Sequence, residues 1–169
     1  MSVRDVDFVP VVSPADAAVV ARLANEIWYE HYVPIIGREQ VDYMVPRFQS
    51  QAAALAQIGK GLQYFLIHMD GQACGYLAIE PQPAERRMFL SKLYVLKSAR
   101  QHGLGRRALG FIEARAVGAG LGTLWLTVNK FNPALHAYER LGFVKVADVV
   151  ADIGGGYVMD DYRLEKALG

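Results

Sequence analysis

The sequence has little cysteine, little net charge and no long apolar run. Cys74 is the single cysteine among 169 residues, so no disulfide can form within the chain and a reducing compartment is expected. Eighteen basic and seventeen acidic side chains leave a net charge of +1, which gives no field for nucleic acid or an anionic membrane. No apolar stretch approaches the roughly 18 residues that a membrane span needs. These absences predict a soluble, cytoplasmic protein with no nucleic-acid partner and no membrane partner.

The composition predicts one globular domain over residues 1–169. Hydrophobic residues make up 53% and charged residues 21%, which excludes a disordered chain. A chain of this length buries about 70% of its unfolded surface in one core. The first ten residues lack the basic start and apolar core of a signal peptide. We find no internal repeat and no linker long enough to separate two domains.

Apolar periodicity and turn residues predict a mixed α/β chain. Helix starts are indicated by Ser13-Pro14 and by Asn132-Pro133, and Asp70-Gly71 indicates a hairpin. Strands are predicted over residues 3–12, 62–69, 73–79, 88–96, 123–129, 143–149 and 157–166. Helices are predicted over residues 13–33, 41–48 (broken at Pro46), 51–58, 103–117 and 132–141.

A polar turn with two glycines, Gly103 and Gly105, connects the apolar strand 88–96 to the helix that follows. The first N–H groups of a helix lack carbonyl partners and carry about half a positive charge, and glycine lets a ligand approach the backbone. Arg100, Arg106 and Arg107 add full charges that suit a diphosphate. The alternative is an ordinary turn with solvated arginines.

Two familiar nucleotide motifs are absent from this turn. The dinucleotide fingerprint fails because Ala108 stands at its third glycine position, and a Walker loop fails because no Gly-Lys-Ser/Thr follows. The remaining pattern, Arg100-x-x-Gly103-x-Gly105, resembles the Gln/Arg-x-x-Gly-x-Gly/Ala pyrophosphate loop of the GNAT N-acetyltransferase superfamily.

A second motif downstream strengthens this resemblance. The segment from Asn129 to Phe143, with Tyr138-Glu-Arg-Leu-Gly-Phe at its end, is similar to the Asn-x-x-Ala...Tyr-Glu-Lys-Leu-Gly-Phe segment of the same superfamily. The resemblance covers residues 65–166. Met159-Asp160-Asp161-Tyr162 and residues 28–44 also resemble a bacterial branch that includes polyamine acetyltransferases.

The resemblance implies a mixed, mostly antiparallel seven-stranded sheet with helices on both faces. The strands at 88–96 and 123–129 are expected to run parallel and to splay apart, with a bulge in the earlier strand and the pantetheine arm of acetyl-CoA in the gap. The implied cofactor-binding residues are Leu93, Tyr94 and Val95 on the strand, Arg100, Gln101, His102, Gly103, Leu104, Gly105 and Arg106 in the loop, and Asn132 and Tyr138 downstream. No metal is expected, because His68 and His136 lack companions at metal-ligand spacing.

The resemblance also assigns the chemistry of acyl transfer. Tyr138 matches the tyrosine that protonates the leaving thiolate, with packing on Phe143 as the alternative, and the Val95 N–H is expected to hold the oxyanion. Many relatives carry a glutamate base where this chain has Ser91, and serine cannot take an ammonium proton. Glu80, Glu30 and His31 are candidate bases, and proton loss to bulk water is a further alternative.

The acceptor side is indicated by an aromatic cluster near the start of the chain. Trp28, Tyr29, His31 and Tyr32 combine apolar area with polar tips, which suits an acceptor-binding wall; packing of short helices on the sheet is the alternative. We therefore expect acetyl transfer from acetyl-CoA to a primary amine of a small molecule, a polyamine or an amino-acid-like amine.

Rival functions stay open at this level. A protein or peptide N-acetyltransferase is one, and a CoA-binding regulatory protein without turnover, which the serine at position 91 favours, is another. Cys74 lies mid-strand with no histidine placed to activate it, so core packing is favoured over an acyl-enzyme. A homodimer is one expected assembly, since family members often pair through terminal strands.

Overall fold

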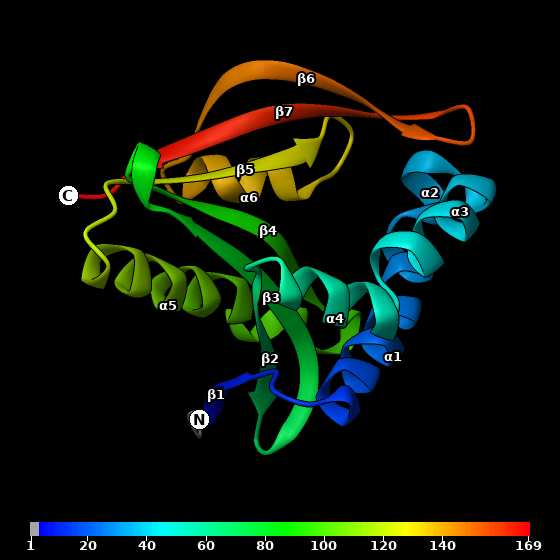
Figure 1. The fold of residues 1–169 in the computed structure, drawn as a ribbon, viewed down its shortest axis with the longest axis horizontal. Helices are drawn as coiled ribbons and strands as arrows, with labels where there is room; N and C mark the ends of the chain where they lie inside the picture. Colours follow the sequence, from blue (N-terminus) through cyan, green and yellow to red (C-terminus); the bar gives the residue numbers. More distant parts are fainter. Residues whose placement is uncertain (1–3) are drawn as a thin grey trace. The chain divides into compact units, whose positions relative to one another are not determined.

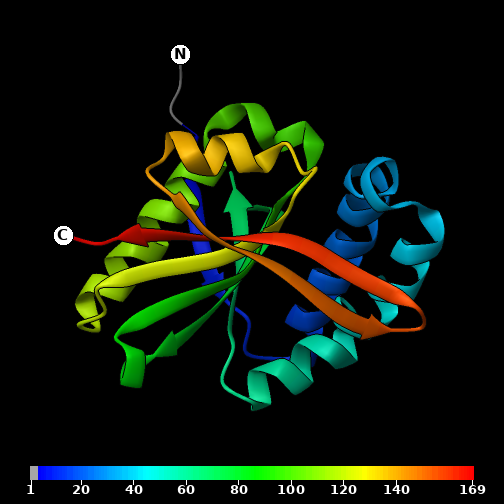
Figure 2. The same cartoon turned by 90° about the horizontal axis from the view of Figure 1, so that it is seen from above.

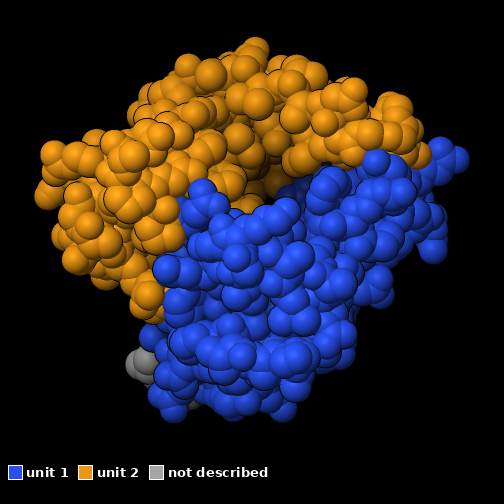
Figure 3. All heavy atoms as spheres, viewed as in Figure 1, with its two compact units in different colours: residues 1–80, 92–109 blue, residues 81–91, 110–169 orange. Residues whose placement is uncertain are grey.

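The computed structural model describes residues 4–169, which form two compact units (Figure 3). Unit 1 comprises the chain up to Glu80 together with Lys92–Leu109, and unit 2 comprises Pro81–Ser91 with Gly110–Gly169. Two strands and one long helix contribute residues to both units. The prediction of one domain stays a prediction, because two compact units can belong to one folding domain.

The strands are β1 (Val6–Pro10), β2 (Gln63–Met69), β3 (Gln72–Gln82), β4 (Arg87–Val95), β5 (Thr123–Asn129), β6 (Val144–Gly154) and β7 (Tyr157–Ala167). The helices are α1 (Pro14–His31), α2 (Val33–Ile36), α3 (Arg38–Phe48), α4 (Gln51–Gly59), α5 (Leu104–Gly118) and α6 (Ala134–Arg140), with short 3₁₀ turns η1 (Pro83–Glu85) and η2 (Lys97–His102). The predicted start of the first strand at Val3 lies outside the described residues.

The strands form one sheet in the order β1-β2-β3-β4-β5-β7-β6. Pairing is antiparallel in β1–β2, β2–β3, β5–β7 and β6–β7, and parallel in β4–β5. The β4–β5 register covers Arg87 to Phe89 opposite Thr123 to Trp125. The predicted fold class, a mixed and mostly antiparallel seven-stranded sheet with helices, is therefore confirmed.

Unit 1 contains the helices α1 to α4, with α1 packed against α3 and α4 (Figure 1). The predicted start of α1 is confirmed, because the Ser13 Oγ accepts a hydrogen bond from the Asp16 N–H at 3.1 Å and Pro14 occupies the first turn. One face of α1 is buried at helical spacing. That face consists of Ala17, Val20, Leu23, Ala24, Ile27 and Trp28. Across residues 4–169, no helix combines the length and the hydrophobicity that crossing a membrane requires.

The bounds of one predicted helix need correction, and one short helix was missed. The helix predicted from Val41 and broken at Pro46 begins at Arg38 and continues through Pro46 to Phe48. Proline removes one N–H donor, and here the helix ends two residues later, so little of the helical ladder lies beyond it. The short helix α2 was not predicted.

A buried lysine ties the helices of unit 1 to the sheet. Lys92 on β4 is 7% exposed, and its Nζ donates to the Phe48 carbonyl at 2.6 Å, to Gln57 Oε1 at 2.8 Å and to the Tyr64 hydroxyl at 2.6 Å. Three acceptors match the three donors of an ammonium group. The ends of α3 and α4 are thus attached to β4 through one side chain.

A close backbone approach joins β3 to the end of β4 in unit 1. A Cβ added at Gly75 would overlap the Tyr94 carbonyl oxygen and lie 3.1 Å from the Val95 Cα. The Leu96 N–H donates to the Cys74 carbonyl at 2.8 Å immediately beyond this contact. Only a residue without a side chain fits at position 75.

Unit 2 is dominated by β5, β7 and the long β6–β7 hairpin, which lie side by side in both ribbon views (Figures 1 and 2). Both hairpin strands extend to the glycine turn, so β6 ends at Gly154 rather than at the predicted residue 149. Lys166 on β7 forms an ion pair with Glu113 on α5 at 2.8 Å. The Phe89 and Trp125 rings stack at 4.2 Å across the parallel pair β4–β5.

We expect Gly75→Ala to lower the free energy of unfolding by about 1–3 kcal/mol, because the added methyl group overpacks against backbone that cannot rotate away. Gly110→Ala is the matched control: it lies within α5 with no atom near its added Cβ, and it should raise stability by about 0.5–1 kcal/mol. Urea denaturation of both variants measures the difference. Equal stability of the two variants would contradict the close approach.

The stability contributed by Lys92 should depend on pH. Burial lowers the pKa of the Lys92 ammonium to about 7. The unfolded chain, in which the pKa is near 10.5, therefore holds more protons above pH 7, and stability rises with pH until that value. Between about pH 7.5 and about pH 9, the free energy of unfolding of the wild type should rise by about 1–2 kcal/mol relative to that of Lys92→Met. Denaturation curves of both proteins across this range test it, and a constant difference would contradict the lowered pKa.

Candidate active site

The turn that follows β4 in unit 1 is stabilised by contacts of Arg100, a residue of the turn itself. The Arg100 Nε donates to the Val95 carbonyl at 3.1 Å, and its Nη2 lies 4.0 Å from Glu30 Oε1. Arg100 therefore closes the loop back onto the end of β4. Glu30, a candidate base in the sequence analysis, is the acidic partner in the contact with Arg100.

The glycine turn leads directly into α5. Gly103 has a φ of 69°, the left-handed conformation that glycine adopts without strain, and it separates η2 from α5. The Arg107 N–H makes the first α-helical bond, to the Gly103 carbonyl at 3.1 Å. The N–H groups of Leu104, Gly105 and Arg106 thus precede the hydrogen-bond ladder of the helix, as an anion site requires.

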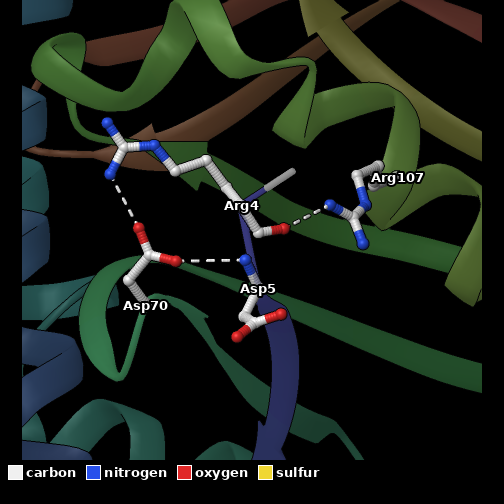
Figure 4. A network of polar contacts seen from close by, with 4 residues as sticks. All are labelled: Arg4, Asp5, Asp70 and Arg107. Atoms are coloured by element: carbon white, nitrogen blue, oxygen red, sulfur yellow. Dashed lines mark hydrogen bonds and ion pairs between the residues drawn. The ribbon is translucent and has the colours of Figure 1, made fainter. Parts of the chain in front are cut away.

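The neighbouring arginine, Arg107, has a structural contact instead. Its Nη1 donates to the Arg4 carbonyl at 3.1 Å, while Asp70 accepts from the Arg4 side chain at 2.7 Å and from the Asp5 N–H at 3.0 Å (Figure 4). This network fixes the start of the chain to the β2–β3 turn and to the first turn of α5. Arg107 was expected to add charge for a diphosphate, and the structure gives it a backbone partner.

The predicted acceptor residues gather around Tyr94 in unit 1. The Trp28 and Tyr32 rings stack at 4.2 Å, and both meet the Tyr94 ring edge-on, at 5.6 and 6.1 Å. The His31 ring meets Tyr32 at 4.9 Å. Trp28 is only 3% exposed and therefore supports the cluster from the core. Residues predicted from two distant segments are brought together here.

Tyr29, the fourth predicted acceptor residue, has other partners within unit 1. Its hydroxyl donates to Asp42 on α3, and the Arg38 guanidinium lies 5.5 Å from its ring centre. The hydrogen bond to Asp42 raises the pKa of the Tyr29 phenol. Tyr29 thus connects α1 to α3.

Asn132 and Tyr138 belong to unit 2. Asn132 is buried, and its Oδ1 accepts from the Ala134 N–H at 3.0 Å, so the side chain closes the turn before α6. The helix begins at Ala134, two residues after its predicted start at residue 132. The Tyr138 ring meets Phe143 edge-on at 5.4 Å, which is the packing contact expected as an alternative role.

The remaining candidate nucleophile and bases are weakly placed. Cys74 is buried, its Sγ lies 3.5 Å from the Ile67 carbonyl, and burial raises the pKa of the thiol, which disfavours the reactive thiolate. Ser91 lies on the part of β4 within unit 2, and Glu80 at the half-buried end of β3.

Sequence reasoning missed a buried ionisable group in unit 2. Asp161 on β7 is 4% exposed, and burial, followed by the charge of Asp160, raises the pKa of its carboxyl to about 6. A hydrogen bond from Thr127 and the charge of Lys130 partly oppose this shift. The sequence signal for this group was the pair Asp160-Asp161 within a predicted strand, since adjacent side chains of a strand point to opposite faces of the sheet and one of the two acids can face the buried side.

The Acetyltransferase (GNAT) family profile matches residues 24–143. The chain is 32% identical over 81 residues to streptothricin acetyltransferase of Streptomyces lavendulae, a match that covers 47% of this chain and 43% of the relative. The chain thus spans less than half the length of that curated relative.

Solved structures agree with this assignment. The PaiA N-acetyltransferase of Thermoplasma acidophilum, determined with coenzyme A, superposes with a TM-score of 0.77 over 99% of both chains at 20% identity, which shows a shared fold. An acetyltransferase from Thermus thermophilus is 27% identical, with a TM-score of 0.69 over 99% of this chain and 100% of its own. Because the family profile covers more than half of the sequence and the same fold recurs in these enzymes, the chain belongs to the Acetyltransferase (GNAT) family.

Proposed function

We propose that the protein transfers an acetyl group from acetyl-CoA directly to a primary amine of a small molecule. The observation that carries the proposal is the turn between β4 and α5, where Gly103 is left-handed and three N–H groups precede the helix ladder. Membership of the GNAT family supplies the reaction class. A lone anion site would not by itself indicate an acetyltransferase.

The turn between β4 and α5 offers the space and the positive charge that a diphosphate needs. A Cβ built at Gly103 or Gly105 meets no atom within 4 Å, so the space in front of the backbone is open. Arg100 and Arg106 supply full positive charges beside the helix dipole. We assign the diphosphate of CoA to the amides from Gln101 to Arg106, and the pantetheine arm to the backbone of Leu93, Tyr94 and Val95.

The chemistry follows from the groups available. The thioester is already activated, so holding amine and thioester together can contribute up to about 7–11 kcal/mol. A phenol in water has a pKa near 10 and can protonate a thiolate whose acid has a pKa near 8.5, and Tyr138 is the proposed donor. The Val95 N–H is the proposed donor to the oxyanion. Asn132 is proposed to bond the cofactor arm.

The acceptor is proposed to be a small amine bound near the aromatic cluster of Trp28, His31, Tyr32 and Tyr94. Cationic amines are attracted to the faces of aromatic rings. The similarity to an enzyme named for acetylating streptothricin supports a small-molecule acceptor. The finer proposal of a polyamine rests on the resemblance of residues 159–162 and 28–44, and a protein N-terminus is the rival acceptor.

A CoA-binding protein without turnover is the second candidate, and the serine at position 91 favours it. A panel of primary amines, assayed by thiol release from acetyl-CoA, separates the two functions. Release with at least one amine supports the enzyme. CoA binding without release for any amine supports the regulatory protein.

Arg106→Glu should weaken CoA binding by about tenfold or more, because a charge-assisted contact to phosphate becomes a repulsion. Calorimetric titration of CoA into the purified protein measures the change. Arg22→Glu on α1 is the matched control: it makes the same charge change at another exposed arginine of unit 1 and should leave affinity unchanged. Equal losses in both variants would point to net charge alone.

Tyr138→Phe should lower kcat by about 100-fold or more while CoA affinity changes little, since it removes only the acid that protonates the thiolate. The phenylalanine ring keeps the edge contact to Phe143, so the melting temperature should stay near that of the wild type. Single-turnover measurements with acetyl-CoA and a reactive amine provide the test. A fully active Tyr138→Phe enzyme would leave Tyr138 with a packing role.

A further inference from the structure

In unit 2, Asp161 shares one face of the sheet with polar side chains of β5 and β4. In the β5–β7 ladder Asp161 stands opposite Asn129, and opposed residues share a face. Phe89 and Trp125 are opposed in the β4–β5 ladder, and their rings stack, which fixes the same face there. Since side chains alternate along a strand, Thr127 and Ser91 belong to this face as well.

The carboxyl of Asp161 is buried and incompletely satisfied. It is 4% exposed, and its Oδ1 has no hydrogen-bond partner within residues 4–169. Buried polar atoms are nearly always paired, and leaving a charged acceptor unpaired destabilises the folded chain. The neighbouring Asp160 differs, because its Oδ1 lies 2.8 Å from the Lys130 ammonium. Asp161 Oδ1 therefore has an acceptor position that no residue from 4 to 169 fills.

We propose that Asp161 binds the ammonium group of the acceptor and takes up its proton, the function that Ser91 cannot perform. The inference rests on the proposed acetyl transfer, for which a protonated amine must become a nucleophile. An ammonium group is the complement of a buried carboxylate oxygen, since it carries both the opposite charge and hydrogen-bond donors. An anionic or apolar ligand would leave the carboxylate unsatisfied.

The charged groups around Asp161 set the pH at which it can act. Asp160 on β7 raises the pKa of Asp161, and Lys130 after β5 lowers it. Asp148 on β6 lies 3.6 Å from Lys130 and draws off part of that positive charge. Arg163 shares the face and is paired with Glu165 at 3.0 Å. With burial added, the pKa reaches about 6, so the carboxylate is the main form at neutral pH.

The proton balance of the reaction is complete with two protein groups. The ammonium R–NH₃⁺ gives one proton to the Asp161 carboxylate, and the free amine forms a C–N bond with the thioester carbon. The C–S bond then breaks, and the thiolate takes the Tyr138 proton. The second proton of the attacking nitrogen restores Tyr138. Asp161 releases its proton to water, so the products are the amide, CoA and one proton.

The test compares Asp161→Asn, Asp161→Glu and a control, Asp152→Asn, which makes the same substitution on exposed β6 of the same hairpin. We expect Asp161→Asn to lower kcat/KM for the amine by about 100-fold, to lose the rise in rate near pH 6 and to keep the KM for acetyl-CoA. Asp161→Glu should recover part of the activity. Asp160→Asn should shift the rise to lower pH. An unchanged rate and pH profile in Asp161→Asn would overturn the assignment.

A second measurement does not depend on turnover. The Asp161 carboxyl carbon can be titrated by NMR in ¹³C-labelled protein with CoA, with and without n-butylamine. Binding of the ammonium should lower the pKa of Asp161, and the control variant Asp152→Asn should show the same shift. No shift would overturn the site even if acetyl transfer is observed. A shift without transfer to any amine would instead remove the proposed reaction and keep a binding site for ammonium ions.

Discussion

The close approach of Gly75 to the backbone of Tyr94 is the constraint on which the rest of unit 1 depends. With no side chain at position 75, the β4 backbone comes against β3, and the next amide, at Leu96, bonds to Cys74. The end of β4 is thereby fixed before the chain turns. The position of the turn and the orientation of the Tyr94 ring both follow from this contact, because side chains alternate from a fixed backbone.

From that fixed point, covalent continuity positions two functional regions. Tyr94 meets Trp28 and Tyr32 of the first helix, and Arg100 folds back to the Val95 carbonyl. The glycine turn and the first residues of α5 come directly after. The proposed acceptor wall and the proposed diphosphate turn are therefore parts of one local structure, and a displacement at the end of β4 would move both.

The sequence predicted the elements that carry strong local signals. Ser13-Pro14 caps α1, Asp70-Gly71 turns the β2–β3 hairpin, and glycine stands left-handed before α5. The prediction that a helix breaks at Pro46 was wrong, because α3 ends only two residues later and tolerates the proline there. The loop residues could be identified because they are contiguous. The meeting of Trp28 with Tyr94 could not be derived from spacing, since contacts between distant segments depend on the packed fold.

Sequence reasoning missed two buried ionisable residues, Lys92 and Asp161, and their surroundings differ. Lys92 is surrounded by three acceptors, one for each donor of its ammonium, so its burial serves to attach α3 and α4 to the sheet. A lysine at the buried face of a strand pattern hints at such a role, but its partners lie 28 to 44 residues away in the chain.

Asp161 has the opposite character, with an oxygen that no described group satisfies. A buried charge whose hydrogen bonds are all made favours the one fold that makes them. A buried charge with an unmade hydrogen bond destabilises the fold as long as no ligand completes it. Replacing Asp161 by an uncharged isostere would relieve that cost above pH 6, where the folded carboxyl is ionised. We interpret the carboxylate at this position through the cation that Asp161 is proposed to bind.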